Sequence, residues 1–182
     1  LRPEDTTGAS AGQALDTADY LFEPTPDELL KTLLPFHVAV QVSRALLVAV
    51  GARASVRTQC PLILRPRSVP DPDVAVVPGC DDDYFSAHPE AARLVVEVAD
   101  SSLPQDRLSK SRIYAQAAIP EYWIVNLREG VLEVMRDPDP VAALYRELRT
   151  LRAGDRIDIA SLPGTSIEVA DMLPRIPPAN EI

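Results

Sequence analysis

The chain has 182 residues, of which 46% are apolar, and a formal net charge of −9. Its length and apolar content allow a single domain with a substantial core, and its negative charge argues against nonspecific adhesion to nucleic acid. No apolar run reaches the ~20 residues of a membrane span. Two isolated cysteines, Cys60 and Cys80, predict free thiols in a reducing cytoplasm, and no motif indicates an organic cofactor.

The N-terminal part of the chain predicts an arm followed by two helices. Residues 1–25 are polar and aperiodic, so we expect a mobile or surface-wrapped arm, with residues 26–182 forming a single domain. Thr25 and Pro26 favour the start of a helix over residues 25–34. Pro35 should interrupt it, and a second helix should then run to Gly51.

The rest of the chain alternates short apolar segments with one long amphipathic segment. This order predicts an α+β domain around one central mixed sheet flanked by helices. The central strands are expected at 73–78, 94–99 and 121–126, with helix 104–118 packed on the sheet. Further expected elements are a pair of strands at 54–59 and 61–66, a hairpin at 131–137 and 143–151, and a last short helix at 169–174.

Glu97 is the one charged residue in the apolar segment LVVEVA (94–99). A buried ionised carboxylate costs several kcal/mol unless a partner, a metal or a shifted pKa relieves it. Asp73 opens the preceding strand, and if the two strands are neighbours both carboxylates converge on one edge of the sheet. Such a pair suits Mg²⁺ or Mn²⁺, which bind oxygen ligands. The alternative is a buried ion pair between Glu97 and Lys110.

Asp106, Lys110 and Tyr114 are spaced four residues apart on the helix that follows Glu97. A lysine beside the metal would orient an attacking water and meet phosphate charge. Carboxylates, a lysine and Mg²⁺ together suit phosphodiester hydrolysis. We interpret Asp106 as a helix-start residue, and Tyr114 as an aromatic residue of the core or of an interface.

The PD dipeptide at 72–73, followed by VEVA at 96–99, resembles the PD-(D/E)XK nuclease superfamily, and residues 88–127 resemble the Uma family of restriction endonuclease-like proteins. The resemblance covers about residues 36–174. It implies a restriction endonuclease-like fold, DNA as substrate, and metal ligation by Asp73, Glu97 and the backbone carbonyl of Val98. It implies Lys110 as the catalytic lysine, because Ala99 stands where the superfamily has its lysine, and His37 as an accessory residue.

One feature of the family is missing. Its members carry a short ELIDGE-like hairpin whose glutamate adds to the site, and residues 1–35 contain no such segment; Glu23 and Glu28 are the nearest substitutes. Two functions therefore stay open, namely a Mg²⁺-dependent DNA endonuclease and a non-catalytic or regulatory protein of the same fold that binds a partner.

The charges are unevenly distributed. Residues 31–70 carry six basic and no acidic residues, whereas residues 71–100 carry eight acidic residues and one basic residue. The basic block is either a phosphate-facing surface beside a metal site or a solvated face. Because cutting both strands of a duplex takes two active sites, we also expect a homodimer, with region 121–151 and the first long helix as candidate surfaces.

Overall fold

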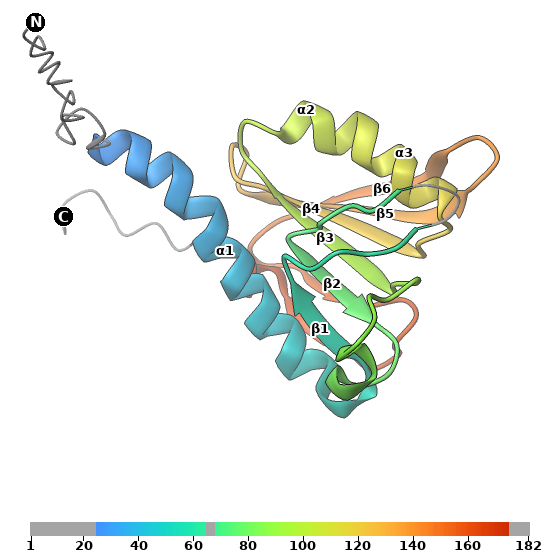
Figure 1. The fold of residues 1–182 in the computed structure, drawn as a ribbon. Coiled ribbons are helices and arrows are strands. Elements are labelled where there is room, and N and C mark those ends of the chain that lie inside the picture. Colours follow the sequence, from blue (N-terminus) through green and yellow to red (C-terminus); the bar gives the residue numbers. More distant parts are fainter. Residues whose placement is uncertain (1–24, 65–67, 175–182) are drawn as a thin grey trace, which may run out of the picture.

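A six-stranded mixed sheet forms the centre of the protein, in a computed structural model that describes residues 25–64 and 68–174 (Figure 1). Its strands lie in chain order, and the central pair β3–β4 is parallel while the other neighbouring pairs are antiparallel. Residues 1–24 of the expected arm lie outside the described part of the chain. The strands are β1 (Ser55–Thr58), β2 (Val74–Val77), β3 (Leu94–Ala99), β4 (Glu121–Asn126), β5 (Val131–Asp139) and β6 (Leu144–Leu151).

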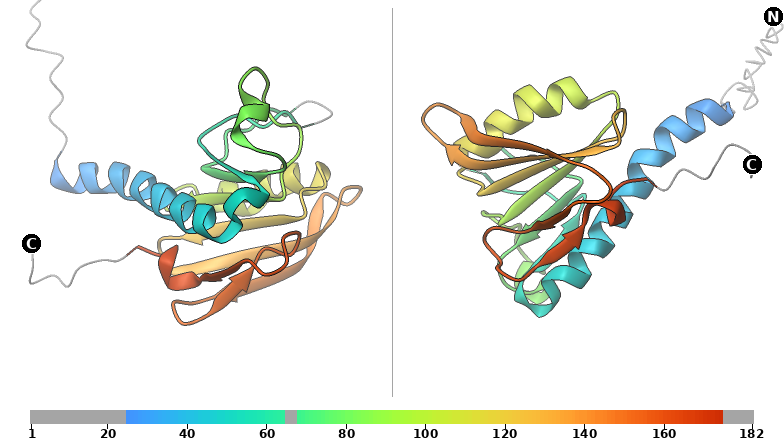
Figure 2. Two further views of the ribbon diagram at one scale, coloured as in Figure 1. Left: turned by 90° about the horizontal axis from the view of Figure 1, so that it is seen from below. Right: turned by 180° about the vertical axis from the view of Figure 1, so that it is seen from behind.

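Helices cover the two faces of this sheet separately (Figures 1 and 2). On one face, α1 (Pro26–Val50) packs together with a small second sheet of β7 (Arg156–Asp158) and β8 (Ser166–Glu168). The other face carries α2 (Leu103–Gln105) and α3 (Ser111–Gln116). The predicted α+β fold is therefore confirmed, with all three expected central strands in the sheet and the expected helix packed on it.

Helix α1 runs without a break through Pro35, so the predicted interruption is wrong. A capping box fixes its start: the Glu28 N–H donates to Thr25 Oγ1 at 3.3 Å, and the Thr25 N–H donates to Glu28 Oε2 at 2.8 Å. The loss of one backbone hydrogen bond at a proline is tolerated in a helix that is also held by tertiary packing.

The packing of α1 comes from a stripe of apolar side chains that face the sheet. By length and hydropathy alone, Lys31–Arg53 could cross a membrane, contrary to the expectation that no apolar segment is long enough. This test is also passed by core helices of soluble proteins, and α1 buries its stripe almost completely against the sheet. The stripe consists of Val38, Ala39, Val42, Leu46 and Val50.

Two of the shorter elements differ from the predictions. The expected strand at 61–66 is absent among its described residues, and β1 pairs with β2 instead. The backbone N–H groups of Leu62 and Ile63 donate to carbonyls of distant prolines, which takes them out of any ladder with β1. The hairpin is confirmed as β5–β6, and the last short helix is a single 3₁₀ turn, Val169–Asp171.

A π-helical turn, Asp106–Lys110, separates α2 from α3 where the sequence predicts continuous α-helix. The Ser111 N–H donates to the Asp106 carbonyl, an i→i+5 bond, and the Tyr122 hydroxyl donates to the same oxygen at 3.1 Å. Such turns occur frequently at functional sites. The turn places Asp106 and Lys110 over the strand that carries Glu97.

Replacing Arg136 with methionine should destabilise the fold by about 3–5 kcal/mol, because it leaves a buried carboxylate without its cation. Glu121 is fully buried, and its Oε1 lies 2.6 Å from Arg136 Nε. Urea unfolding measures the effect. The exposed Arg149 on the neighbouring strand is the control, and its replacement by methionine should change the free energy of unfolding by less than about 0.5 kcal/mol.

Candidate active site on strand β3

Asp73 and Glu97 lie side by side at the junction of β2 and β3. The two strands are antiparallel, with Val74 opposite Val96, so Asp73 comes opposite the end of β3 that carries Glu97. The Val98 N–H donates to Asp73 Oδ2 at 2.7 Å, and the Asp73 N–H donates to Glu97 Oε2 at 3.4 Å. The structure thus brings together the two carboxylates that the sequence singled out.

Glu97 is buried, with 1% of its surface exposed, and both of its carboxylate oxygens have partners. The Tyr114 hydroxyl donates to Oε1 at 2.7 Å, and Lys110 Nζ lies 2.9 Å from Oε2. Burial raises the pKa of Glu97 to about 7; the charge of Lys110 opposes this rise, and the charge of Asp73 adds to it. The carboxyl group can therefore exchange a proton near neutral pH.

Lys110 is held by a second carboxylate as well. Its Nζ lies 3.0 Å from Asp106 Oδ1, and Asp106 is as buried as Glu97. Burial works to lower the pKa of Lys110, but the charges and hydrogen bonds of the two carboxylates outweigh it and raise that pKa. Because 29% of the Lys110 side chain is exposed, solvent reaches the edge of the site along this side chain.

Two further residues contact the Glu97–Lys110 pair. Tyr114 lies in the core, as the sequence predicts, and its hydroxyl also donates to Glu97. Asp106, which the sequence suggested as a helix-start residue, contacts Lys110, and the spacing of the two residues contained the signal. The four-residue spacing of Asp106, Lys110 and Tyr114 places all three side chains on the side of the helix that faces β3. A polar face on a helix packed against a buried glutamate would have identified them.

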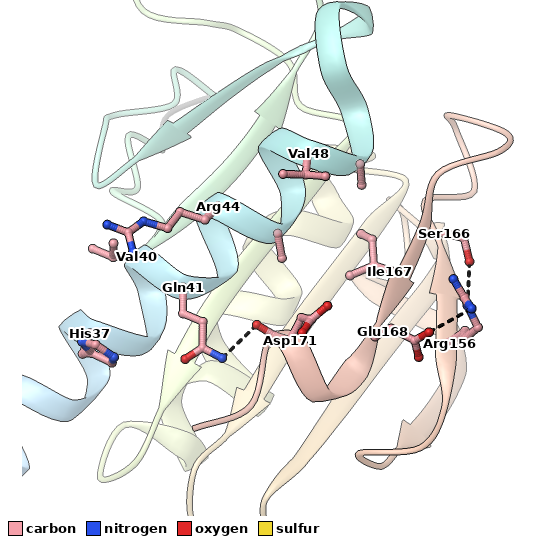
Figure 3. Close-up of a pocket in the computed structure, with 12 residues that line it drawn as sticks. His37, Val40, Gln41, Arg44, Val48, Arg156, Ser166, Ile167, Glu168 and Asp171 are labelled. Carbon is pink, nitrogen blue, oxygen red and sulfur yellow. Dashed lines mark hydrogen bonds and ion pairs between the residues drawn. The ribbon is translucent and has the colours of Figure 1, made fainter. Parts of the chain in front are cut away.

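The predicted accessory residue His37 is not part of this site. It is exposed on α1, which covers the opposite face of the sheet, and it lines a groove of about 620 Å³ between α1 and β8 (Figure 3). Glu28, a substitute for the missing family glutamate, is used in the helix cap instead. Glu23 lies outside the described residues.

Two arginines of the basic block at residues 31–70 make contacts within the fold. Arg53 donates to the carbonyls of Ala49, Val50 and Pro163, at 2.9–3.2 Å. Arg57 lies over the ring of Tyr84, 5.3 Å from its centroid. These two guanidinium groups are therefore engaged within the fold, and Arg65 and Arg67 lie outside the described residues.

The donor set suits a hard cation with a small number of protein ligands. Within the described ranges, no group of three or more His, Cys, Asp or Glu side chains is placed to hold a metal ion. Asp73 and Glu97 offer carboxylate oxygens, and no described residue donates a hydrogen bond to Asp73 Oδ1. Mg²⁺ commonly binds through one or two carboxylates and keeps several waters, so the residues present fit this ion.

Comparison with known proteins finds one similar fold and one short segment of similar sequence. A crystal structure of a putative nuclease belonging to DUF820 from Anabaena variabilis superposes with a TM-score of 0.56 at 13% identity, covering 75% of this chain and 79% of that chain. At this identity the likeness concerns the fold alone. A segment of 59 residues is 48% identical to the ATP synthase gamma chain of Anaeromyxobacter dehalogenans, a match of 31% of this chain and 19% of that protein. The chain thus spans about a fifth of that relative's length.

A family model also matches most of the chain. The profile of the Uma2 family, described as "Putative restriction endonuclease", matches residues 29–170. This range contains the whole central sheet, the helix over it and the residues Asp73, Glu97, Asp106, Lys110 and Tyr114. The chain therefore belongs to the Uma2 family, whose description supports a nuclease function in general.

Proposed function

We propose that this protein is a Mg²⁺-dependent DNA endonuclease that hydrolyses phosphodiester bonds with Asp73, Glu97 and Lys110. The proposal rests on one observation. The buried Glu97 carboxylate lies 2.9 Å from the Lys110 ammonium and accepts a hydrogen bond from the Asp73 N–H, while the Asp73 carboxylate accepts from the Val98 N–H next to Glu97. Membership of a family described as restriction endonucleases supports the same class of reaction.

Each proposed residue has a separate task. Asp73 and Glu97 hold the cation, Mg²⁺ or Mn²⁺, and the backbone carbonyl of Val98 is a further oxygen ligand. The Val98 N–H already donates to Asp73, and a residue in a strand directs its N–H and C=O to the same edge. When bound, the cation polarises the phosphate and lowers the pKa of a bound water. Lys110 orients the attacking water or meets the charge of the scissile phosphate.

Plasmid cleavage during titration with Mg²⁺ or Mn²⁺ tests this proposal directly. Wild-type protein should nick or linearise supercoiled DNA in proportion to metal occupancy, and Glu97→Gln should show no cleavage above background. Calorimetry on the same samples measures the metal affinity. Cleavage that is unaffected by a chelator, or by Glu97→Gln, would contradict the assignment of this site.

A second candidate is a non-catalytic protein of the same fold that binds a partner. Two observations favour it. Among the described residues, no third His, Cys, Asp or Glu side chain joins Asp73 and Glu97 in a group that could hold a metal ion. Residues 1–35 also lack the glutamate hairpin that is typical of the family. In that case Glu97 and Lys110 form a structural ion pair. Calorimetry separates the two functions, because this second candidate predicts no divalent-metal binding.

We further propose that the nuclease acts as a homodimer. Both surfaces expected from the sequence expose large apolar side chains, namely Leu33, Phe36 and Val48 on α1, and Val141, Leu144 and Leu148 at the β5–β6 hairpin. Light scattering at micromolar concentration should report twice the mass of the chain. Leu148→Glu should shift that mass towards the monomer if the hairpin is the interface, whereas Val48→Glu should do so if α1 is; a monomeric wild type would refute the dimer.

A further inference from the structure

The ammonium group of Lys110 is shared by two buried carboxylates from different elements. Glu97 on β3 holds it at 2.9 Å, and Asp106 on the π-turn holds it at 3.0 Å. Asp106 is 1% exposed, and neither of its carboxylate oxygens accepts a well-formed hydrogen bond from a described residue, so the Lys110 ammonium, 3.0 Å from Oδ1, is the charged partner that offsets its burial. A buried carboxylate with so few partners is costly, which points to a task beyond packing.

We infer that Asp106 is a positioning residue that keeps the Lys110 ammonium beside Glu97 when a divalent cation engages the Glu97 carboxylate. This inference rests on the proposed metal-dependent function. It gives a role to Asp106, which is not one of the three proposed catalytic residues. Asp106 does not touch the metal or the phosphate; it acts through Lys110.

The charges of the site explain why such a residue is needed. A cation on Glu97 repels the nearby ammonium group and competes for the carboxylate oxygen that holds it. Lys110 has a long flexible stem and is 29% exposed, so without another anchor it would turn out into solvent. The cluster holds three carboxyl groups, those of Asp73, Glu97 and Asp106, and one ammonium group, so Asp106 remains as a partner for Lys110 when a cation takes the Glu97 oxygen.

The π-turn gives Asp106 a fixed position from which to hold the lysine. The Asp106 carbonyl accepts hydrogen bonds from the Ser111 N–H and the Tyr122 hydroxyl. The next residue, Arg107, is bound to Glu133 of β5 at 2.5 and 2.9 Å. Because the turn is tied to two strands, and both carboxylates already contact the ammonium, Lys110 can pass from one to the other without backbone movement.

The chain contains two lysines, Lys31 and Lys110, which allows a chemical test. The N-hydroxysuccinimide ester of acetic acid acetylates free amines, and mass spectrometry of the two lysine peptides gives both rates from one sample. Lys31 is exposed on α1 and serves as the internal reference. Lys110 of wild-type protein should be acetylated more slowly than Lys31, with and without millimolar Mg²⁺.

The first comparison uses the variant Asp106→Asn with and without Mg²⁺. Without Mg²⁺, Lys110 of this variant should still be acetylated slowly, because Glu97 holds its ammonium group. Adding Mg²⁺ to this variant should accelerate Lys110 acetylation about tenfold relative to Lys31, since both charged partners are then lost. The second comparison contains no metal. Lys110 of Glu97→Gln should still be acetylated slowly, because Asp106 holds it, whereas in the double variant Glu97→Gln/Asp106→Asn its acetylation should be about tenfold faster. Asp106→Asn should also lower kcat for plasmid cleavage about 10–100-fold while KM is unchanged.

The outcomes separate the inference from the function on which it rests. If wild-type protein binds no Mg²⁺ by calorimetry, the metal-dependent function is refuted and the inference with it. If Mg²⁺ binds but leaves Lys110 of Asp106→Asn as slow as in wild type, the inference alone is refuted. Fast acetylation of Lys110 in Glu97→Gln also refutes it, and that variant keeps Asp106 intact, so this result does not depend on the folding of Asp106→Asn.

Discussion

Replacing Glu97 with glutamine is expected to abolish Mg²⁺ binding and DNA cleavage while making the protein more stable at alkaline pH. Glutamine keeps the shape of the side chain but removes the charge that holds the cation. Burial raises the pKa of this carboxyl group from 4.5 to about 7, which corresponds to about 3 kcal/mol against its ionised form. Glutamine has no ionised form to bury, so near pH 8 the free energy of unfolding of the variant should exceed that of wild type by up to about 3 kcal/mol. This corresponds to a rise of roughly 5–10 °C in Tm.

The pH dependence follows from the direction of the pKa shift. A folded-state pKa above the unfolded value means that the folded protein binds more protons between about pH 4.5 and 7. Wild-type stability should therefore fall as pH rises through this window, and this fall should be absent in Glu97→Gln. Thermal unfolding from pH 5 to 8 without metal measures it, with the exposed Glu147→Gln as the control. A wild type and a Glu97→Gln variant with parallel pH profiles would contradict the prediction.

Replacing Lys110 with methionine is expected to separate chemistry from metal binding. The two metal carboxylates remain, so Mg²⁺ should still bind, whereas cleavage should fall about 10²–10³-fold because the charge that meets the phosphate is lost. The same change leaves Glu97 and Asp106 buried without their cation, which should cost about 3–5 kcal/mol in the absence of metal.

Mg²⁺ should therefore stabilise Lys110→Met more than it stabilises wild type, because it supplies the positive charge that the variant lacks. Differential scanning fluorimetry with and without Mg²⁺ measures this difference. Arg112→Met, which removes an exposed cation from the same helix, is the control for stability. Full cleavage activity in Lys110→Met would exclude the lysine from the reaction, and loss of metal binding would show that its role is structural.

The central strands were predictable because short runs of apolar, mostly β-branched residues favour a buried strand over other secondary structure. LVVEVA has apolar residues on both faces, as is typical of a strand buried within a sheet, and β3 is buried along its whole length. Its glutamate was therefore a conspicuous exception and indicated the site correctly. The strand–helix–strand order also predicted a central sheet with a helix on one face, and β3 and β4 are its parallel pair.

The elements that were predicted wrongly depend on interactions that a local pattern does not contain. Pro35 interrupts helices in isolation, but the capping box and the buried stripe of α1 hold this helix on both sides of it. The π-turn has no sequence signature of its own, and the tyrosine hydroxyl that donates to its Asp106 carbonyl comes from β4, a separate element. Asp106 has the position of a common helix-start residue, which concealed its contact with Lys110 although the four-residue spacing allowed it.

The functional cluster is contiguous in sequence, since Asp73, Glu97, Asp106, Lys110 and Tyr114 all come from residues 73–114. Its side chains come from the entry of β2, from β3 and from the helical segment after β3, while Tyr122 of β4 and Glu133 of β5 hold the π-turn in place. Such a unit closes only short loops and can form early in folding. It should also tolerate changes of length elsewhere: an insertion at the exposed tip of the β5–β6 hairpin, around Pro140 and Val141, lies outside the unit and should leave its geometry intact.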